Sequence, residues 1–208
     1  MKSNIFRYSR IVLSLFSILF LLQSSSLLSQ NKEQFYNELK TKLTGLKSIS
    51  FEFAALDGSN LNGKITATKD KYKMILPGRI IISNSKTVWN YSPEQAKVLI
   101  STIADINSAS IHNIFFQIVE NYEPSSLKVA TKSTGAKYYE LELKSNQNPD
   151  DYITLNLNYK TKNIEAVNFS INGQSANLAI KNLLFNPKVK DNQFEFKPPK
   201  GTQVIDLR

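Results

Sequence analysis

The fold of this chain is decided by its residues 153–173, which read ITLNLNYKTKNIEAVNFSING. Apolar and polar residues alternate from Ile153 to Tyr159 and again from Val167 to Ile171. A period of two predicts strands with one buried face and one face in water. The stretch ends on Asn172-Gly173, the dipeptide that most strongly indicates a tight turn between antiparallel strands. These residues therefore predict neighbouring strands of an antiparallel sheet.

The same pattern extends outward in both directions. Short apolar-alternating runs are separated by turn residues such as Pro77-Gly78, Asn84-Ser85 and Ser92-Pro93. Closely spaced strands of this kind indicate an antiparallel meander. The expected strands outside the opening stretch cover residues 49–53, 61–68, 72–76, 80–83, 87–91, 97–101, 139–144 and 177–185.

Two segments have a helical period instead. In Glu33–Lys47 the apolar residues recur every three or four positions, and Gly45 marks the expected end. Ser110–Glu120 is apolar over most of its circumference, and Pro124 follows shortly after it. Each of these helices needs an apolar surface on which to bury its stripe.

The sequence thus predicts a mainly β (α+β) fold built on a single strongly curved antiparallel sheet. We expect an open half-barrel whose apolar concave face is covered by the N-terminal helix and a short lid helix. An apolar pocket between the sheet and the helices is one reading of this pattern. A filled core is equally compatible with it.

Residues 1–30 are typical of a signal peptide. Lys2, Arg7 and Arg10 precede a run of twelve apolar or small residues that ends at Leu22, and small and polar residues follow. Such a run is too short to span a bilayer as a helix. An uncleaved membrane anchor is the alternative interpretation. We expect residues 31–208 to form one domain that is exported and works as a monomer.

Composition excludes several classes of function. The chain has no cysteine, so a disulfide, a thiol nucleophile and a cysteine-bound metal are ruled out, as is a lipid attached to a cysteine. Its net charge of +9 is spread along the chain, whereas a nucleic-acid-binding protein usually concentrates positive charge on one surface.

No residue pattern points to catalysis. The one histidine, His112, lies beside the apolar stripe of the second helix, where a structural role is the ordinary one. Asp150-Asp151 follows a proline and fits a solvated turn, and the seven glycines form no phosphate loop. We expect no cofactor and no transition metal; a calcium site built from oxygen ligands stays open.

Three stretches resemble the LolA-like family of periplasmic outer-membrane lipoprotein carriers. Residues 194–204, FEFKPPKGTQV, are similar to the closing motif of that family. Residues 82–91, ISNSKTVWNY, are similar to its tryptophan hairpin, and the apolar run 113–120 falls where the family has its lid helix. The order of elements agrees from Phe35 to Val204. The resemblance implies a half-barrel that binds acyl chains and has no catalytic activity.

Two positions depart from the family pattern. Asn84-Ser85 stands where the family has Asp-Gly, so the turn lacks the usual glycine. The family's Arg-Pro pair, whose arginine is implied to control opening of the lid, is absent. Its position falls on Thr68 or Lys69, which we take as the lid-latch region.

The resemblance implies a carrier that takes lipoproteins from an inner-membrane ABC-type releasing complex to the outer membrane, where a receptor lipoprotein can accept them. A carrier of another lipid, an envelope-stress sensor domain and, less favoured, a periplasmic hydrolase are the alternatives. The residues expected to line the cavity and the lid are Phe35, Leu39, Leu43, Phe51, Phe53, Met74, Trp89, Ile111, Ile114, Phe115, Ile118, Leu141, Leu155, Leu157, Val167 and Phe169.

Overall fold

The computed structural model describes residues 32–103 and 111–208. The chain divides into two compact units, with the boundary in the sequence between Thr41 and Lys42. In the first unit, the described residues 32–41 are helical and bury Phe35, Tyr36 and Leu39. The helix ends at residue 43, and Gly45 has a φ of 76°, in line with its expected place at the helix end. The expected leader, residues 1–30, lies outside the described residues, so its boundary stays a prediction.

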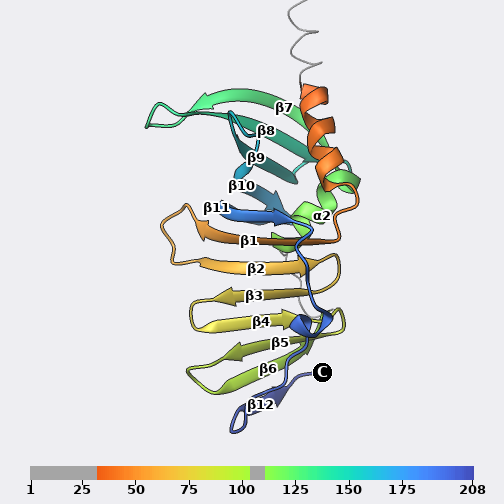
Figure 1. The fold of residues 1–208 in the computed structure, drawn as a ribbon, viewed down its shortest axis with the longest axis vertical. Helices are drawn as coiled ribbons and strands as arrows, with labels where there is room; N and C mark the ends of the chain where they lie inside the picture. Colours follow the sequence, from red (N-terminus) through yellow and green to blue (C-terminus); the bar gives the residue numbers. More distant parts are fainter. Residues whose placement is uncertain (1–31, 104–110) are drawn as a thin grey trace, which may run out of the picture. The chain divides into compact units, whose positions relative to one another are not determined.

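The second unit is built on one sheet of twelve strands (Figure 1). The strands follow the order β12-β6-β5-β4-β3-β2-β1-β11-β10-β9-β8-β7, and neighbours are antiparallel except for β12 and β6. The bounds are β1 Ser48–Ala55, β2 Asn62–Thr68, β3 Tyr72–Leu76, β4 Arg79–Ser83, β5 Thr87–Ser92, β6 Lys97–Thr102, β7 Tyr122–Thr131, β8 Lys137–Ser145, β9 Tyr152–Asn158, β10 Ile164–Ile171, β11 Gln174–Phe185 and β12 Gln203–Asp206.

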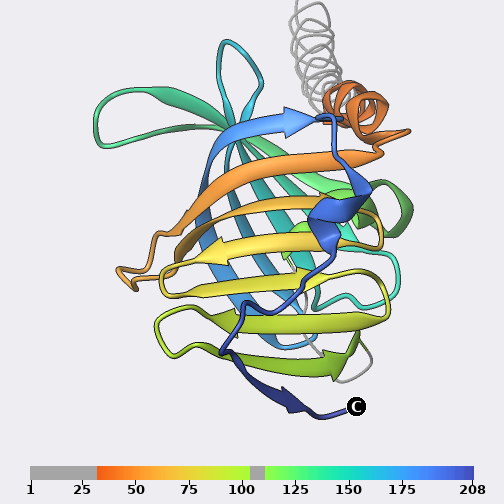
Figure 2. The same ribbon diagram turned by 60° about the horizontal axis from the view of Figure 1, so that its bottom comes forward.

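The sheet is strongly curved and holds the helix α2, Ile111–Asn121, on its concave side (Figures 1 and 2). Helix α2 contacts both β2 and β7, although five other strands separate these two in the sheet. A flat sheet would place β2 and β7 nearly 30 Å apart at about 4.8 Å per strand, whereas an eleven-residue helix is only about 16 Å long. The mainly β fold with one open, curved sheet and helices is confirmed.

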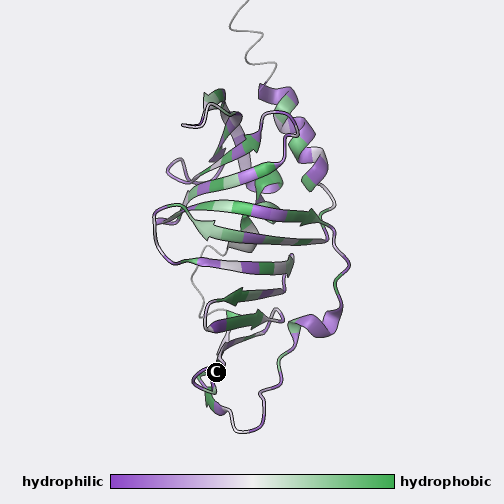
Figure 3. Cartoon of the chain, turned by 60° about the vertical axis from the view of Figure 1, so that its left-hand side comes forward, coloured by the Kyte–Doolittle hydropathy of each residue, from purple (hydrophilic) through white to green (hydrophobic). Residues whose placement is uncertain are grey.

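Cross-strand pairing identifies the face that α2 covers, here called the inner face. Phe51 contacts Phe115 of α2 and pairs with Ile65, which in turn pairs with Met74. Partners in register point to the same side of a sheet. Beyond β1, Phe53 pairs with Ile180 on β11. Leu178, two residues before Ile180 and on the same face, pairs with Val167, so the inner face continues onto β10. Hydrophobic and hydrophilic colours alternate along most of the strands, as Figure 3 shows.

The opposite side, or outer face, has a smaller core of its own on β4–β6. Ile82, Val98 and Ile100 are buried there, although their register places them opposite the inner face. The C-terminal segment after β11 crosses this side of the sheet (Figure 2), and the ring of Phe196 lies 5.0 Å from that of Tyr91. The expectation of one apolar and one wet face is therefore wrong for this part of the sheet.

Two strands were not predicted from the sequence. β7 follows α2 directly and includes Pro124, beside which the register shifts. A proline lacks the N–H donor of a regular ladder and is tolerated at such an irregularity or on an edge strand. β12 has only four residues and no apolar alternation, and it pairs parallel with β6.

The turn at Asn172-Gly173 is confirmed. Asn172 has a φ of 52° and Gly173 a φ of 75°, the pair of positive values that a type I′ turn requires. In the turn before β5, the positive φ of 79° falls on Ser85, whereas Asn84 uses its side-chain oxygen to accept hydrogen bonds from the N–H groups of Lys86 and Thr87. Ser85 therefore occupies the conformation for which the family motif supplies glycine.

Candidate functional site

The centre of the inner face is occupied by the apolar side of α2. Ile114, Phe115 and Ile118 are at most 1% exposed. The ring of Phe115 meets that of Phe51 edge to face, with centroids 5.2 Å apart. Helical spacing places these three side chains on one side of α2, so this side of the helix is the buried one.

The inner face of β8, β9 and β10 is a continuous apolar surface. Leu141 pairs with Leu155, and Leu155 pairs with Val167, so three neighbouring strands present aliphatic side chains in one row. Phe169 pairs with Ile153 in the next row. All of these side chains are at most 5% exposed. Removing such a surface from water is favourable by about 25 cal/mol per Å² of apolar area.

The structure brings most of the predicted residues onto this one surface. Those that share the inner face or the apolar side of α2 are Phe51, Phe53, Met74, Ile114, Phe115, Ile118, Leu141, Leu155, Leu157, Val167 and Phe169.

Strand register does not assign the other predicted residues to this surface. Trp89 pairs with Ile82 and Ile100 on the outer face, the side of the sheet that the C-terminal segment crosses. Phe35 and Leu39 belong to the N-terminal unit and are buried, as is Leu43. Ile111 is the first residue of α2, and its side chain lies outside the described part of the structure.

The sequence reasoning missed several inner-face residues, among them Ile81 on β4 and Leu99 on β6. Ile81 pairs with Met74, and Leu99 pairs with Asn90, which itself pairs with Ile81. Both apolar side chains are only half-buried, unlike those under α2. They belong to the runs Ile80–Ile82 and Val98–Ile100, where the lack of alternation hides which residue faces which side. They extend the apolar surface beyond the part under α2.

The two residues of the expected lid-latch region, Thr68 and Lys69, make different contacts. The hydroxyl of Thr68 accepts a hydrogen bond from the N–H of Lys71 and so shapes the β2–β3 turn. Lys69 reaches α2, because its Nζ lies 3.4 Å from Oε1 of Glu120 near the end of that helix. Both charged side chains are more than half exposed, so this ion pair contributes at most about 1 kcal/mol.

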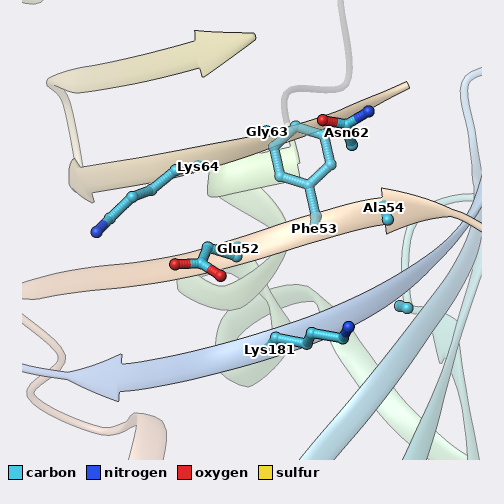
Figure 4. Close-up of a pocket in the computed structure, with 8 residues that line it drawn as sticks. Glu52, Phe53, Ala54, Asn62, Gly63, Lys64 and Lys181 are labelled. Carbon is cyan, nitrogen blue, oxygen red and sulfur yellow. The ribbon is translucent and has the colours of Figure 1, made fainter. Parts of the chain in front are cut away.

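A separate pocket of about 330 Å³ lies over β1, β2 and β11 (Figure 4). Glu52, Lys64 and Lys181 bring charged groups to it from the outer face. The ring of Phe53 packs over Gly63, where the absence of a side chain leaves room for it. A carboxylate between two lysines makes this pocket unsuited to an acyl chain.

The described residues contain no arrangement that suggests catalysis. Within residues 32–103 and 111–208 there is no group of three side chains fit to hold a metal ion. Burial raises the pKa of Tyr72 on the inner face, in agreement with a low-dielectric surface. His112 lies in α2, but its side chain is outside the described part. No helix in the described ranges is long and apolar enough to cross a membrane.

Comparison with known proteins identifies the family. Residues 76–197, more than half of the chain, match the family described as "Outer membrane lipoprotein carrier protein LolA". The chain belongs to the LolA family. The matched segment runs from the end of β3 to the C-terminal segment, so it includes α2 and most of the inner face.

The chain is also similar to several individual proteins. The outer-membrane lipoprotein carrier protein of Erwinia tasmaniensis is 29% identical over 184 residues, which cover 82% of this chain and 87% of that protein. An uncharacterised protein of Methanocaldococcus jannaschii is 23% identical over 214 residues; the match covers 95% of this chain but only 61% of the archaeal protein. An uncharacterised conserved protein of Thermus thermophilus, solved as a crystal structure, superimposes with a TM-score of 0.49 and 14% identity over 84% of this chain and 98% of that one.

The LolA family is a family of lipoprotein carriers, which are binding proteins and not enzymes. In this chain, a curved sheet holds α2 on its apolar face. The inner face and α2 are therefore the candidate site of this member.

Proposed function

We propose that this protein carries the acyl chains of lipoproteins across the periplasm, from the inner to the outer membrane of a Gram-negative cell. The observation that carries the proposal is the burial of α2 on the inner face, with Phe115 packed on Phe51. Membership of the LolA family supports the same function.

The physical problem is the exposed acyl chain. Each buried methylene contributes about 0.8 kcal/mol, so a chain of ~16 carbons in water forgoes on the order of 12 kcal/mol of burial. A lipoprotein released without a carrier would aggregate. A carrier has to recover enough of this energy to keep the lipid soluble, and still let the lipid go.

Helix α2 provides that compromise. In the closed state its three buried side chains already cover the apolar surface, so an acyl chain has to displace them. The energy lost with those contacts is subtracted from the energy gained by burying the lipid. The net affinity is thereby lowered, and delivery to a tighter acceptor becomes possible.

The partners follow from the same reasoning. We propose that an inner-membrane ABC-type complex supplies the energy for loading and that an outer-membrane receptor lipoprotein accepts the cargo. Residues 1–30 are proposed to direct the chain to the periplasm and to be removed there. The carrier is proposed to act as a monomer without catalysis or cofactor.

A matched pair of variants on one strand tests the acyl-binding face. Ile81 lies on the inner face and its neighbour Ile80 on the outer face, and both are half-buried. Ile81→Glu places a carboxylate where the acyl chain lies and should weaken binding of a triacylated lipopeptide by at least about tenfold. Ile80→Glu should leave that affinity nearly unchanged. The measurement is displacement of an apolar fluorescent dye by the lipopeptide.

The two variants also separate folding from binding. Both introduce a glutamate at a half-buried position of β4, so their thermal midpoints should fall by similar amounts. Equal lipopeptide affinities for the two variants would show that the inner face of β4 is not part of the site. Failure of the unaltered protein to bind the lipopeptide would remove the carrier function altogether.

A further inference from the structure

One corner of the sheet combines positive charge with exposed aromatic and apolar side chains. We call residues 127–140 and 157–165 the hairpin corner; they form the β7–β8 hairpin and the adjoining β9–β10 turn. The β7–β8 hairpin projects beyond its neighbouring strands (Figures 1 and 2). This projection makes the corner available to a flat surface.

The hairpin corner carries five lysines and two glutamates, an excess of three positive charges. Lys128 lies 3.9 Å from Glu140, and Lys132 lies 2.8 Å from Glu165, so both carboxylates are already matched. The remaining lysines are Lys137, Lys160 and Lys162, of which the first two are exposed. The corner therefore attracts anions, and its acids do not cancel that attraction.

Aromatic and aliphatic side chains lie among these lysines. The rings of Tyr139 and Tyr159 stack with centroids 4.9 Å apart, and Tyr159 is 41% exposed. Val129 pairs with Tyr139 across the hairpin and is 54% exposed. Tyrosine rings beside lysines and an exposed aliphatic group are typical of surfaces that sit at the headgroup level of a bilayer.

The hairpin corner is continuous with the inner face. Tyr139 pairs with Leu157, and the next inner-face row on the same strands is Leu141 with Leu155. A hydrocarbon chain that enters beside Tyr139 can thus pass onto buried leucines along one unbroken side of the sheet. Contact of this corner with a membrane would shorten the path of the lipid through water.

We propose that the hairpin corner docks on the anionic headgroups of a bilayer. Docking brings the end of the inner face against the membrane that the cargo leaves or enters. This proposal rests on the acyl-carrying function proposed above. The lysines supply attraction to lipid phosphates, and the tyrosine pair with Val129 enters the headgroup layer. Each lysine near such a surface strengthens binding about fivefold, so three excess charges give on the order of a hundredfold preference for anionic over neutral vesicles.

Co-sedimentation with vesicles tests this docking directly. We expect the protein to bind phosphatidylglycerol-containing vesicles at low salt and to bind pure phosphatidylcholine vesicles far more weakly. The double variant Lys137→Glu with Lys160→Glu should lose at least about tenfold in affinity for the anionic vesicles. The control, Lys188→Glu with Lys200→Glu, changes the net charge equally at two exposed lysines outside the corner and should lose far less.

A second variant guards against misfolding of the first. Tyr159→Ala removes the exposed ring of the stacked pair and should weaken vesicle binding at all salt concentrations, because the lost contribution is not electrostatic. The docking proposal is overturned if the anionic vesicles do not bind, if the two lysine pairs lose equal affinity, or if both corner variants bind as the unaltered protein does. Capture of an acidic protein by the corner without vesicle binding also overturns it.

Lipopeptide binding in the absence of vesicles keeps the two proposals apart. The lysine variant of the corner should retain its affinity for the lipopeptide in dye displacement, because neither lysine lies on the buried part of the inner face. Loss of vesicle binding with normal lipopeptide binding would locate the defect in docking. Normal vesicle binding without lipopeptide binding would instead refute the carrier function.

Discussion

Replacing Phe115 by alanine should open α2 without unfolding the sheet. Phe115 is fully buried and meets Phe51 at 5.2 Å, so the change removes contacts that amount to about 3–5 kcal/mol in a rigid core. The expected loss of global stability is smaller if α2 can leave the inner face by itself. The open state lacks the contact already, and the loss is therefore limited to the free energy that holds the lid closed.

The free energy that holds the lid closed sets the size of the expected effects. A lid held closed by about 2 kcal/mol is open roughly 3% of the time, a population that suits a site that must load. Phe115→Ala should then lower the free energy of unfolding by no more than about 2 kcal/mol and leave the lid mostly open. Leu155→Ala, a matched change in the sheet, should cost the full amount of about 2–5 kcal/mol.

Three measurements decide the question. Urea unfolding gives the global stability of each variant, and hydrogen exchange of the α2 amides gives the opening of the lid. Dye affinity should rise by up to about thirtyfold in Phe115→Ala, because the competent state becomes dominant. Lys69→Ala should raise it by at most about fivefold, and only at low salt, because its ion pair with Glu120 is exposed.

The opposite pattern would refute the lid. In that case Phe115→Ala loses as much global stability as Leu155→Ala, the α2 amides exchange only on global unfolding, and dye affinity does not rise. Helix α2 would then be ordinary core, and the inner face would not be accessible to an acyl chain.

Three further predictions concern the scaffold. Ser85→Gly should stabilise the protein by about 1 kcal/mol in urea unfolding, because glycine adopts the observed φ of 79° without the strain that serine bears; a loss of stability would contradict this. Gly63→Ala should destabilise by about 2 kcal/mol or more, since the new Cβ would lie 2.5 Å from the backbone oxygen of Ile75; an unchanged thermal midpoint would show that β2 and β3 move apart freely. The hydrogen bond from Lys132 holds the pKa of Glu165 below its ordinary value of 4.5, so this pair should stabilise the β7–β8 hairpin fully above that pH and lose its effect as the pH falls through the lowered pKa; Glu165→Gln should abolish this part of the acid dependence of hairpin hydrogen exchange.

Much of the fold could be predicted because its strands obey a simple rule. β8, β9 and β10 each have one face on the core and one in water, so alternation in the sequence shows both the strand and its inward residues. Leu141, Leu155 and Val167 were therefore placed correctly on one surface. The apolar period of 111–120 likewise gave α2 and its buried side.

The rule fails where both faces of a strand are apolar. On β4 and β6 the C-terminal segment packs on the outer face, while the inner face remains apolar, so Ile80–Ile82 and Val98–Ile100 read as uniform runs. Trp89 was assigned to the cavity for the same reason. The sequence shows a large apolar residue in a strand, but not whether its side chain lies on the inner or the outer face. The covering segment comes about a hundred residues later in the chain, and no local pattern reports it.

What the sequence by itself determined is local: strand period, helix period, the Asn172-Gly173 turn and a chain too poor in histidine and cysteine for common metal or thiol chemistry. The tertiary structure alone decided which side of each strand lies on the inner face, that β12 forms the edge strand beside β6, and that Lys69 meets Glu120. The physical reason is range. Backbone preference and apolar period act over a few residues, whereas sheet curvature brings together side chains that are fifty or more residues apart, and their contacts exist only once the sheet has closed around the helix.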